Sequence, residues 1–215
     1  NQIMSTSTSS KYIITGIGTD VGKTVVSAIV AQALKAAYWK PVQAGDLDNT
    51  DSMKVDRYTS DAVKVLPEQF KLNHPMSPHA AAQLDGVSIR LEDFVLPEVQ
   101  GNLIVEGAGG LLVPLNSDGL LFADLCQQLN LPIILVSRHY LGSINHTLLT
   151  AEVLKNRNLP VKGIIFNGEE NSASEAIILQ LTGFKNLGRI PQVENIDQAF
   201  IREQAQLLEA NLLAD

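Results

Sequence analysis

The residues with the clearest capacity for chemistry lie near the start of the chain, where positions 16–24 read Gly-Ile-Gly-Thr-Asp-Val-Gly-Lys-Thr. The apolar run 12–15 comes directly before them. A strand that delivers a glycine-rich loop into the start of a helix presents backbone N–H groups that cradle phosphate. In such a loop Lys23 reaches the terminal phosphates and the hydroxyl of Thr24 binds Mg²⁺. The segment therefore predicts a phosphate-binding loop.

The spacing of the glycines in this loop differs from the usual motif. Five residues separate Gly16 from Gly22 and three separate Gly18 from Gly22, and neither separation is the usual one. The alternative is a strand, a turn and a helix with an incidental Gly-Lys-Thr. Because the strand–loop–helix context is present, the pattern favours the phosphate loop.

Three further polar side chains are candidates for the same site, because ligands bind beyond the carboxyl ends of parallel strands. Lys40 begins the segment 40–45 that ends the second predicted strand, where it either points into the crevice of the phosphate loop or is a solvated lysine. Glu106 follows the apolar residues 103–105 and is either a metal contact or a chance acid in a glycine-rich turn. Asp51 stands at a predicted helix start, either as its cap or as a third Mg²⁺ contact beside Thr24 and Glu106.

The elements that position these side chains follow from the apolar pattern of the chain. Short runs that are apolar on both faces, as in buried parallel strands, predict strands at 12–15, 38–42, 103–106, 133–137, 161–167 and 187–190. Helices are predicted at 23–36, 51–65, 91–99, 122–129, 143–158, 172–181 and 196–213, and the least regular segment is 73–86. This alternation predicts an α/β, single-domain P-loop fold: a mostly parallel β-sheet with helices on both faces.

Length and composition agree with one domain. The chain has 215 residues, of which 45% are apolar and 18% charged, so it can bury a core and differs from disordered sequences. We expect the domain to cover residues 11–215. Residues 1–10 are polar, are rich in Ser and Thr, and lack the apolar core of a signal peptide. They are interpreted as a flexible leader or an expression remnant.

Charge and cysteine content narrow the class of function. The net charge of −7, without a basic run, argues against nucleic acid as a partner. No apolar run reaches the ~18 residues that a membrane span needs, so no membrane partner is expected. The single cysteine, Cys126, excludes a disulfide framework and a cysteine-based zinc site within one chain, fits a cytoplasmic location, and is expected in the core. No zinc is expected at the four histidines, which are His74, His79, His139 and His146.

Short motifs follow one another along nearly the whole chain. They are Thr-Gly at 15–16 and Thr-Asp-Val-Gly-Lys-Thr at 19–24, Tyr-Trp-Lys-Pro-Val at 38–42, Ser-Pro-His at 77–79, Val-Glu-Gly-Ala-Gly-Gly at 105–110, Leu-Gly-Ser-Ile-Asn-His at 141–146 and Leu-Gly-Arg-Ile-Pro at 187–191. Together and in this order they resemble the dethiobiotin synthetases, ATP-dependent enzymes that close the ureido ring in biotin biosynthesis. The unusual glycine spacing looks like this family's form of the phosphate loop.

The resemblance implies a specific reaction. The substrate would be 7,8-diaminononanoate, which reacts with CO₂ to give a carbamate. ATP, with Mg²⁺ as cofactor, would phosphorylate the carbamate, and the neighbouring amine would attack the mixed anhydride. The products would be dethiobiotin, ADP and phosphate, and no protein nucleophile is needed because the substrate brings its own amines.

The resemblance also implies site residues. Catalytic roles fall on Lys23 and Lys40, and metal ligation on Thr24, Asp51 and Glu106. Nucleotide contacts fall on Thr19, Asp20, Val21, Gly22, Lys23, Thr24, Val25, Asp51, Glu106, Gly107, Ala108, Gly109, Asn167, Gly168, Pro191, Gln192, Val193 and Asp197. For Asn167 the alternative is an Asn-Gly turn.

Substrate contacts are implied at Lys40, Ala44, Gly142, Ser143 and Asn145. Gly142 permits an unusual backbone and Ser143 can cap the helix that follows, so its free N–H groups would receive the substrate carboxylate. The family is homodimeric, and we expect residues 142–145 of one subunit to face the Lys40 loop of the other. Ala44 stands where the family usually has a hydroxyl residue, and Asp20 where some members carry Glu.

Two other functions are alternatives, and the first of them shares this form of phosphate loop. An amidating synthase of the cobyrinic acid type needs a nucleophilic cysteine, whereas Cys126 lies in a predicted helix rather than a nucleophile elbow. A ParA/MinD-like ATPase switch predicts a second lysine early in the loop and a basic amphipathic C-terminus. Positions 16–22 contain no lysine and positions 207–215 are acidic.

Overall fold

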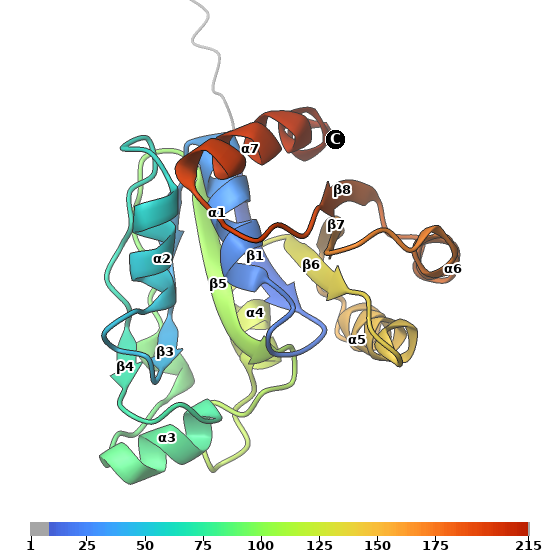
Figure 1. Cartoon of the computed structure of the whole chain (residues 1–215). Coiled ribbons are helices and arrows are strands. Elements are labelled where there is room, and N and C mark those ends of the chain that lie inside the picture. The colour runs from blue at the N-terminus through green and yellow to red at the C-terminus, as the bar shows by residue number, and fades with distance from the viewer. Residues whose placement is uncertain (1–8, 215) are drawn as a thin grey trace, which may run out of the picture.

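The structure, a computed structural model, describes residues 9–214. Its centre is a six-stranded sheet in the order β2-β5-β1-β6-β7-β8, and each neighbouring pair is parallel (Figure 1). These strands are β1 (Lys11–Gly16), β2 (Ala37–Trp39), β5 (Leu103–Gly110), β6 (Ile133–Arg138), β7 (Val161–Asn167) and β8 (Asn186–Ile190). The predicted α/β fold with a parallel sheet is confirmed.

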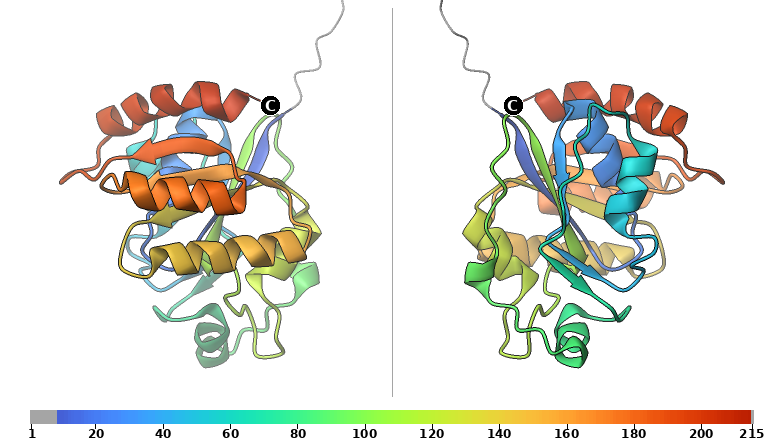
Figure 2. Two further views of the ribbon diagram at one scale, coloured as in Figure 1. Left: turned by 90° about the vertical axis from the view of Figure 1, so that its right-hand side faces the viewer. Right: turned by 90° about the vertical axis from the view of Figure 1, so that its left-hand side faces the viewer.

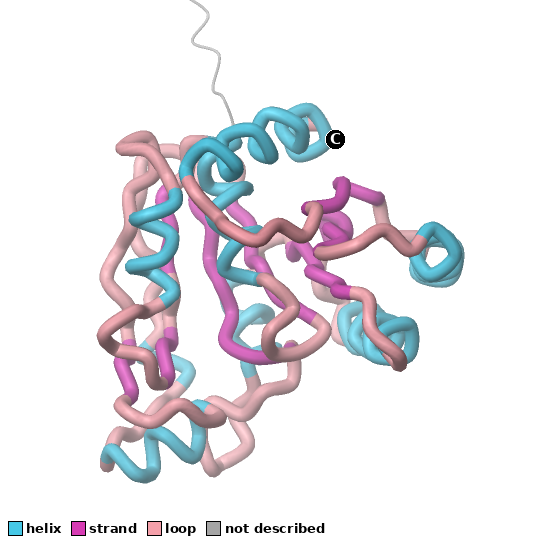
Figure 3. The backbone as a smooth tube through the Cα atoms, viewed as in Figure 1, coloured by secondary structure: helices cyan, strands magenta, loops and turns pink. Residues whose placement is uncertain are grey.

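Helices lie on both faces of this sheet, as predicted. On one face α1 (Lys23–Leu34) packs against α7 (Gln198–Leu213), and on the other α5 (Ser143–Asn156) packs against α6 (Ser172–Thr182) (Figure 2). Shorter helices are α2 (Asp51–Tyr58), α3 (Pro78–Asp85) and α4 (Phe122–Leu129). Figure 3 shows the strands of the central sheet between these helices. Among the described helices, none has both the length and the hydrophobicity that a membrane-spanning helix needs.

The central strands are enclosed because apolar side chains project from both of their faces. Ile13, Ile14 and the segments 103–105, 133–136 and 164–166 are 0% exposed. Burying each such aliphatic side chain contributes about 1.5–3 kcal/mol. The strands that lead to the polar candidates are therefore anchored in the buried core.

The second predicted strand, 38–42, is wrong as a single element. It divides into β2 and β3 (Val42–Ala44), and β3 pairs with β4 (Phe70–Leu72) in a separate two-stranded parallel sheet. Pro41 explains the break, because proline has no N–H to donate to a ladder. The break leaves Lys40 between the two sheets, next to Glu106 and Gly107 in the middle of β5.

Two predicted helices are wrong at their ends or over their length. The helix predicted at 51–65 ends at Tyr58, because Thr59 is extended and its hydroxyl donates to the carbonyl of Val55. The helix predicted at 91–99 is a short 3₁₀ turn, η1 (Leu91–Asp93). Pro97 disfavours helical backbone at the residue before it, which limits this turn.

The least regular predicted segment, 73–86, contains a helix that the sequence analysis did not expect. This helix, α3, begins with Pro78 in its first turn, and Gly86, which directly follows its last residue, has a φ of 66°. Both positions follow the usual preference for proline at the start of a helix and glycine after its end. The prolines and histidines of this segment obscured the apolar pattern of a short helix.

Cys126 lies in α4 and is fully buried, which confirms the prediction of a core cysteine. Burial raises the pKa of its thiol to about 12. The thiol therefore stays protonated at neutral pH and packs as a small apolar group.

The predicted leader, 1–10, falls mostly outside the described residues, which begin at residue 9. Ser10 lies beside the start of β5: its N–H donates to Oδ1 of Asn102 over 2.7 Å, and its carbonyl accepts from the N–H of Leu103. The chain is thus attached to the sheet just before β1.

Candidate active site

The segment between β1 and α1 has the predicted strand–loop–helix order, which begins at Gly16 and ends at Lys23. Gly22, directly before α1, has a φ of 93°. A Cβ atom there would also strike the side chain of Asn167, whose Nδ2 donates to the carbonyl of Val21 over 2.9 Å. Glycine is therefore required at this position both for its backbone conformation and for the close packing of the loop against the end of β7.

Lys23 folds back over the loop. Its Nζ donates to the carbonyl of Gly18 over 2.7 Å, and the residue is 7% exposed. Burial, followed by the nearby ammonium of Lys40, lowers the pKa of Lys23 to about 8. A phosphate group would supply the anion that this buried cation lacks, because phosphate accepts charge-assisted hydrogen bonds more strongly than a carbonyl does.

Glu106 connects several elements beneath the loop. Its Oε1 accepts from the Thr24 hydroxyl over 2.9 Å and from Lys40 Nζ over 3.1 Å, while its Oε2 accepts from the Tyr38 hydroxyl over 2.7 Å. Glu106 itself is 1% exposed. Burial, followed by the charge of Glu106, holds the pKa of Tyr38 well above its usual value, so its hydroxyl remains a donor.

Lys40 is buried between two carboxylates, which excludes the alternative of a solvated lysine. Its Nζ lies 2.7 Å from Asp51 Oδ2 and also donates to the carbonyl of Gly107 over 3.1 Å. Burial alone would lower the pKa of Lys40, but Glu106 and Asp51 outweigh that effect and the pKa is raised. Lys40 is thus a permanent positive charge beside the phosphate loop.

Asp51 is not the cap of α2, which was one of its two interpretations. Thr50 caps that helix by accepting from the N–H of Met53 over 3.1 Å. Burial would raise the pKa of the Asp51 carboxyl, but the contact with Lys40 holds it below its usual range. Lys54 adds a second ion pair to Asp51 at 3.2 Å.

The donor set of Thr24, Asp51 and Glu106 fits Mg²⁺, which prefers oxygen ligands and few protein carboxylates. The hydroxyl of Thr24 and both carboxylates converge on the same point, where Lys40 now bridges the two acids. Within residues 9–214 no three His, Cys, Asp or Glu side chains gather into a richer metal-binding group. The oxygens present match a cation that also takes ligands from nucleotide phosphates and water.

The glycines after Glu106 belong to β5 rather than to a turn, because this strand continues to Gly110. Gly110 pairs with Gly16 across the β1–β5 ladder. A Cβ atom at Gly107 would strike the ring of Phe122, so glycine permits close packing of β5 against the start of α4. Ala108 and Gly109 follow in the same strand, and Gly109 has a φ of 63°.

The ends of β6 and β7 approach the other side of the loop. Arg138, which the sequence analysis did not consider, donates from Nη1 to the carbonyl of Asp20 over 3.2 Å. Asn167 ends β7 and pairs with this arginine across the ladder, and Gly168 directly follows it. Thr19, Val21 and Val25 lie within the same loop-and-helix segment, so the structure brings these predicted nucleotide residues together.

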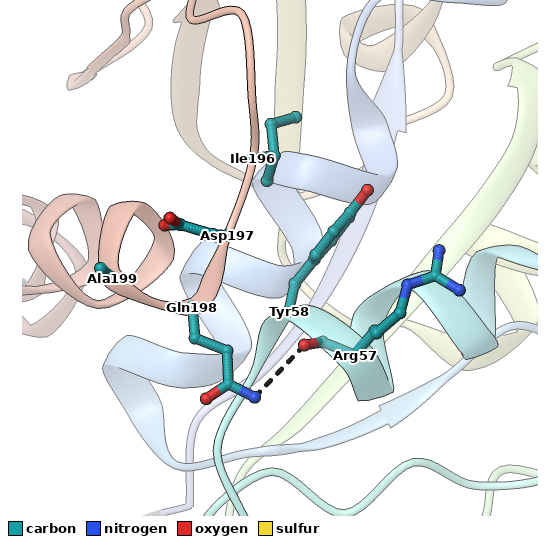
Figure 4. A pocket seen from close by; sticks show the side chains of 6 residues that line it. All are labelled: Arg57, Tyr58, Ile196, Asp197, Gln198 and Ala199. Carbon is teal, nitrogen blue, oxygen red and sulfur yellow. Dashed lines mark hydrogen bonds between the residues drawn. The ribbon is translucent and has the colours of Figure 1, made fainter.

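The predicted contacts after β8 are more dispersed. Pro191, Gln192 and Val193 lie in an exposed segment between β8 and α7. The carboxylate of Asp197 caps α7 by accepting from the N–H of Phe200 over 2.8 Å. It also lines an open pocket of about 470 Å³ with Arg57, Tyr58, Ile196, Gln198 and Ala199 (Figure 4). A nucleotide role for Asp197 remains a prediction.

The predicted substrate residues lie on two sides of the molecule. Gly142, with a φ of 100°, is the residue before α5, and no side chain caps this helix, so the expected capping by Ser143 is wrong. Ser143 is instead buried, Asn145 is exposed, and Leu141 just before them is fully exposed. Ala44 ends β3, and Figures 1 and 2 place β3 and α5 on opposite sides of the central sheet.

Two functional side chains escaped the sequence analysis. Tyr38 was noted only as part of a motif, although a polar tip in a buried strand is a signal for a hydrogen bond. Gln43 accepts from the N–H of Asp51 through its Oε1 over 3.1 Å, which fixes the start of α2.

Comparisons with known proteins point in one direction. A family model described as an AAA domain matches residues 10–199. A protein of Christiangramia forsetii named ATP-dependent dethiobiotin synthetase BioD is 53% identical over 196 residues, which are 91% of this chain and 94% of the relative. A protein of the same name from Rhodopseudomonas palustris is 47% identical over 87% of this chain and 90% of its own length.

Solved structures share the fold at low identity. The Pyrococcus furiosus cell division ATPase MinD has a TM-score of 0.56 at 15% identity and covers 96% of this chain and all of its own. A ParA family ATPase from Chlorobium tepidum has a TM-score of 0.53 at 14% identity, with 95% and 96% of the two chains covered. At such identity the likeness concerns the fold alone, so the ATPase switches gain no functional support from it.

Proposed function

Because this chain belongs to the dethiobiotin synthetase family, we propose that it converts 7,8-diaminononanoate, CO₂ and ATP to dethiobiotin, ADP and phosphate. The observation that carries this proposal is the buried cluster of Thr24, Lys40, Asp51 and Glu106 directly beside Lys23. Such a cluster presents positive charge and metal-ligating oxygens where terminal phosphates would lie, while the two amines of the substrate serve as the nucleophiles of the reaction. That is what a reaction between two bound substrates requires.

The chemistry proceeds in three steps that the substrates themselves can balance. One amine of the diamine adds to CO₂ and loses a proton, which gives a carbamate. A carbamate oxygen attacks the γ-phosphorus, and the bond from that phosphorus to ADP breaks. The second amine then attacks the carbamate carbon, phosphate leaves, and the ureido ring closes.

The chain's own contribution is charge and position. Negative charge moves onto the β-phosphate as the phosphoryl group transfers, and fixed cations there stabilise the transition state. Lys23 and Lys40 are both held beside the loop by short hydrogen bonds, to the carbonyl of Gly18 and to Asp51. Mg²⁺ held by Thr24, Asp51 and Glu106 would supply further charge at the phosphates. Alignment of carbamate and γ-phosphate removes much of the remaining entropic cost.

The proposed assembly is a homodimer in the cytoplasm, with the diamine between subunits. The α5 helix presents free N–H groups behind Gly142, and a helix start is a favourable place for a carboxylate. Within one subunit this helix lies across the sheet from the β3 end that carries Ala44. A second copy would bring an α5 start to the Lys40 side, and the exposed Leu141 offers apolar surface for such a contact.

The proposal is tested by product analysis. The purified protein is incubated with the diamine, isotope-labelled bicarbonate, ATP and Mg²⁺, and the products are examined by mass spectrometry. We expect dethiobiotin that carries the label, and ADP formation that stops when the diamine is omitted. ADP formation that ignores the diamine, with no labelled product, would contradict the proposed reaction.

A further inference from the structure

Tyr38 is a polar residue in the most enclosed part of the molecule. Its side chain is fully buried on β2, the edge strand of the six-stranded sheet next to β5. Its hydroxyl donates to Glu106 Oε2 over 2.7 Å, and both partners are enclosed. A hydrogen bond from a buried hydroxyl to a carboxylate is among the stronger ones in proteins.

This hydrogen bond divides the two oxygens of Glu106 between different partners. Oε2 faces β2 and accepts from Tyr38, whereas Oε1 accepts from Thr24 and Lys40 on the side of the phosphate loop. The plane of the carboxylate is thereby fixed from both sides. Without the Tyr38 hydroxyl, Oε2 would be left without this donor in a site closed to water, and the carboxylate would rotate to share its remaining donors.

We propose that Tyr38 is a positioning residue that holds Glu106 so that its Oε1 is presented to the cation site between Thr24 and Asp51. The inference rests on the proposed magnesium site of the synthetase reaction and extends it to a residue that touches neither nucleotide nor diamine. Residues that orient a ligating carboxylate commonly change metal affinity about 10–100-fold when they are mutated.

A purely structural role for Tyr38 predicts a different result. If Tyr38 only fills space, its ring matters and its hydroxyl does not. Tyr12 offers a matched control, because it is also a buried tyrosine on a strand of the same sheet, and its hydroxyl makes a longer contact of 3.5 Å to the carbonyl of Leu212. Tyr38→Phe and Tyr12→Phe each remove one hydroxyl and keep the ring.

The experiment measures Mn²⁺ affinity by electron paramagnetic resonance in the presence of ADP, and ADP affinity without metal by calorimetry. Circular dichroism and thermal unfolding establish that both variants fold. We expect Tyr38→Phe to bind Mn²⁺ about tenfold more weakly than the unmodified protein. Its metal-free ADP affinity should stay within about twofold, because Lys23 and the loop backbone are unchanged. Tyr12→Phe should match the unmodified protein in both measurements.

Equal Mn²⁺ affinity in Tyr38→Phe and the unmodified protein would overturn the proposal, as would an equal loss in Tyr12→Phe. If Tyr38→Phe does not fold, Glu106→Gln in the background of intact Tyr38 serves as the second comparison: unchanged Mn²⁺ affinity there removes the basis for any role of Tyr38. The outcome is separate from the synthetase reaction, since a protein that binds Mn²⁺ as expected but forms no dethiobiotin contradicts only the proposed function.

Discussion

The Lys23 ammonium is buried and donates to a neutral carbonyl, which is a weaker acceptor than a phosphate oxygen. This environment favours the binding of a phosphate. The residue is 7% exposed and donates to the Gly18 carbonyl. We expect Lys23→Ala to fold, since it removes a buried cation, but to lose roughly 10²–10³-fold in turnover through a missing charge at the phosphates. The measurement is steady-state ADP formation, with circular dichroism as the control for folding. Near-normal turnover in a folded variant would contradict the assigned role.

The pKa of Lys23, about 8 against an ordinary 10.5, gives a second prediction at this scale. A bound phosphate favours the charged lysine, so nucleotide affinity should be constant below pH 8 and fall about tenfold per pH unit above it. In the ligand-free protein the unfolded chain binds this proton between the two values while the folded chain does not. The Lys23 contribution to the free energy of unfolding therefore rises with pH in that window.

Calorimetric titration with ADP between pH 7 and pH 9.5, without metal, checks this dependence. The Lys23→Ala variant is the matched control and should show a flat profile over the same range. A parallel decline in both proteins would assign the effect to another group.

Glu106 and Asp51 differ in burial, and this difference predicts a ranking. The Glu106 side chain is 1% exposed and that of Asp51 is 20% exposed, so water can replace the second more readily. We expect Glu106→Gln to raise the Mg²⁺ concentration for half-maximal turnover by more than about tenfold, and Asp51→Asn to raise it less. Titration of activity with Mg²⁺ checks the ranking. An unchanged requirement in both variants would place the metal elsewhere.

Individual site residues were predictable to the extent that position along a strand reveals them. The phosphate loop that leads to Lys23 follows the apolar run 12–15 and Glu106 follows the apolar run 103–105, and parallel strands end at one edge of a sheet. The partners of Glu106 were less accessible, because Tyr38 and Lys40 reach it across a ladder whose register no local pattern encodes. The expected cap by Ser143 was wrong because Gly142 takes the capping position with its own backbone.

At the scale of elements, the start of α5 is where substrate recognition is predicted. Asn145 is exposed in the first turn of this helix, behind Gly142. We expect Asn145→Ala to weaken diamine binding about tenfold, the loss of one hydrogen bond to a charged group, with ATP binding unchanged. Asn156→Ala, at the exposed opposite end of the same helix, is the control. Calorimetry with each substrate distinguishes the two effects, and an unchanged diamine affinity would contradict the role of Asn145.

The strands were predicted well where their apolar run is continuous and buried. The strands β1, β5, β6 and β7 carry continuous runs of Ile, Val and Leu that are 0% exposed. In contrast β3 and β4 have three residues each, too few to establish a period. Pro41 is visible in the sequence. The strand with which Val42 pairs is not, because its partner Phe70 lies far along the chain.

At the scale of the whole molecule, Leu141 predicts an assembly. It is fully exposed beside Gly142, and Tyr140 next to it is also exposed. We expect Leu141→Asp to favour monomers, because a charge in an apolar contact is not compensated, and to weaken diamine binding with the assembly. Leu207→Asp, at an exposed leucine of α7, is the control. Sedimentation velocity at micromolar concentration checks the result; a protein that is monomeric and fully active without any substitution would refute the shared site.

The architecture as a whole was the most predictable level. Alternating strands and helices limit a chain of this length to few α/β arrangements. The order β2-β5-β1-β6-β7-β8 brings β5 beside β1, which is why Glu106 and Thr24 meet despite a sequence separation of 82. The small β3–β4 sheet was missed, because its pairing is set by the packing of the main sheet rather than by its own residues.

The buried thiol of Cys126 makes the chain well suited to site-specific chemistry. With a pKa of about 12 and no exposure, it should not react with maleimides under conditions that modify a surface thiol. The sequence contains no second cysteine. Fluorophores or spin labels can therefore be attached at a single introduced cysteine, for example beside α5, without first removing a native one. Energy transfer between two such labels would then report how far apart the α5 helices of two copies lie while nucleotide and diamine bind.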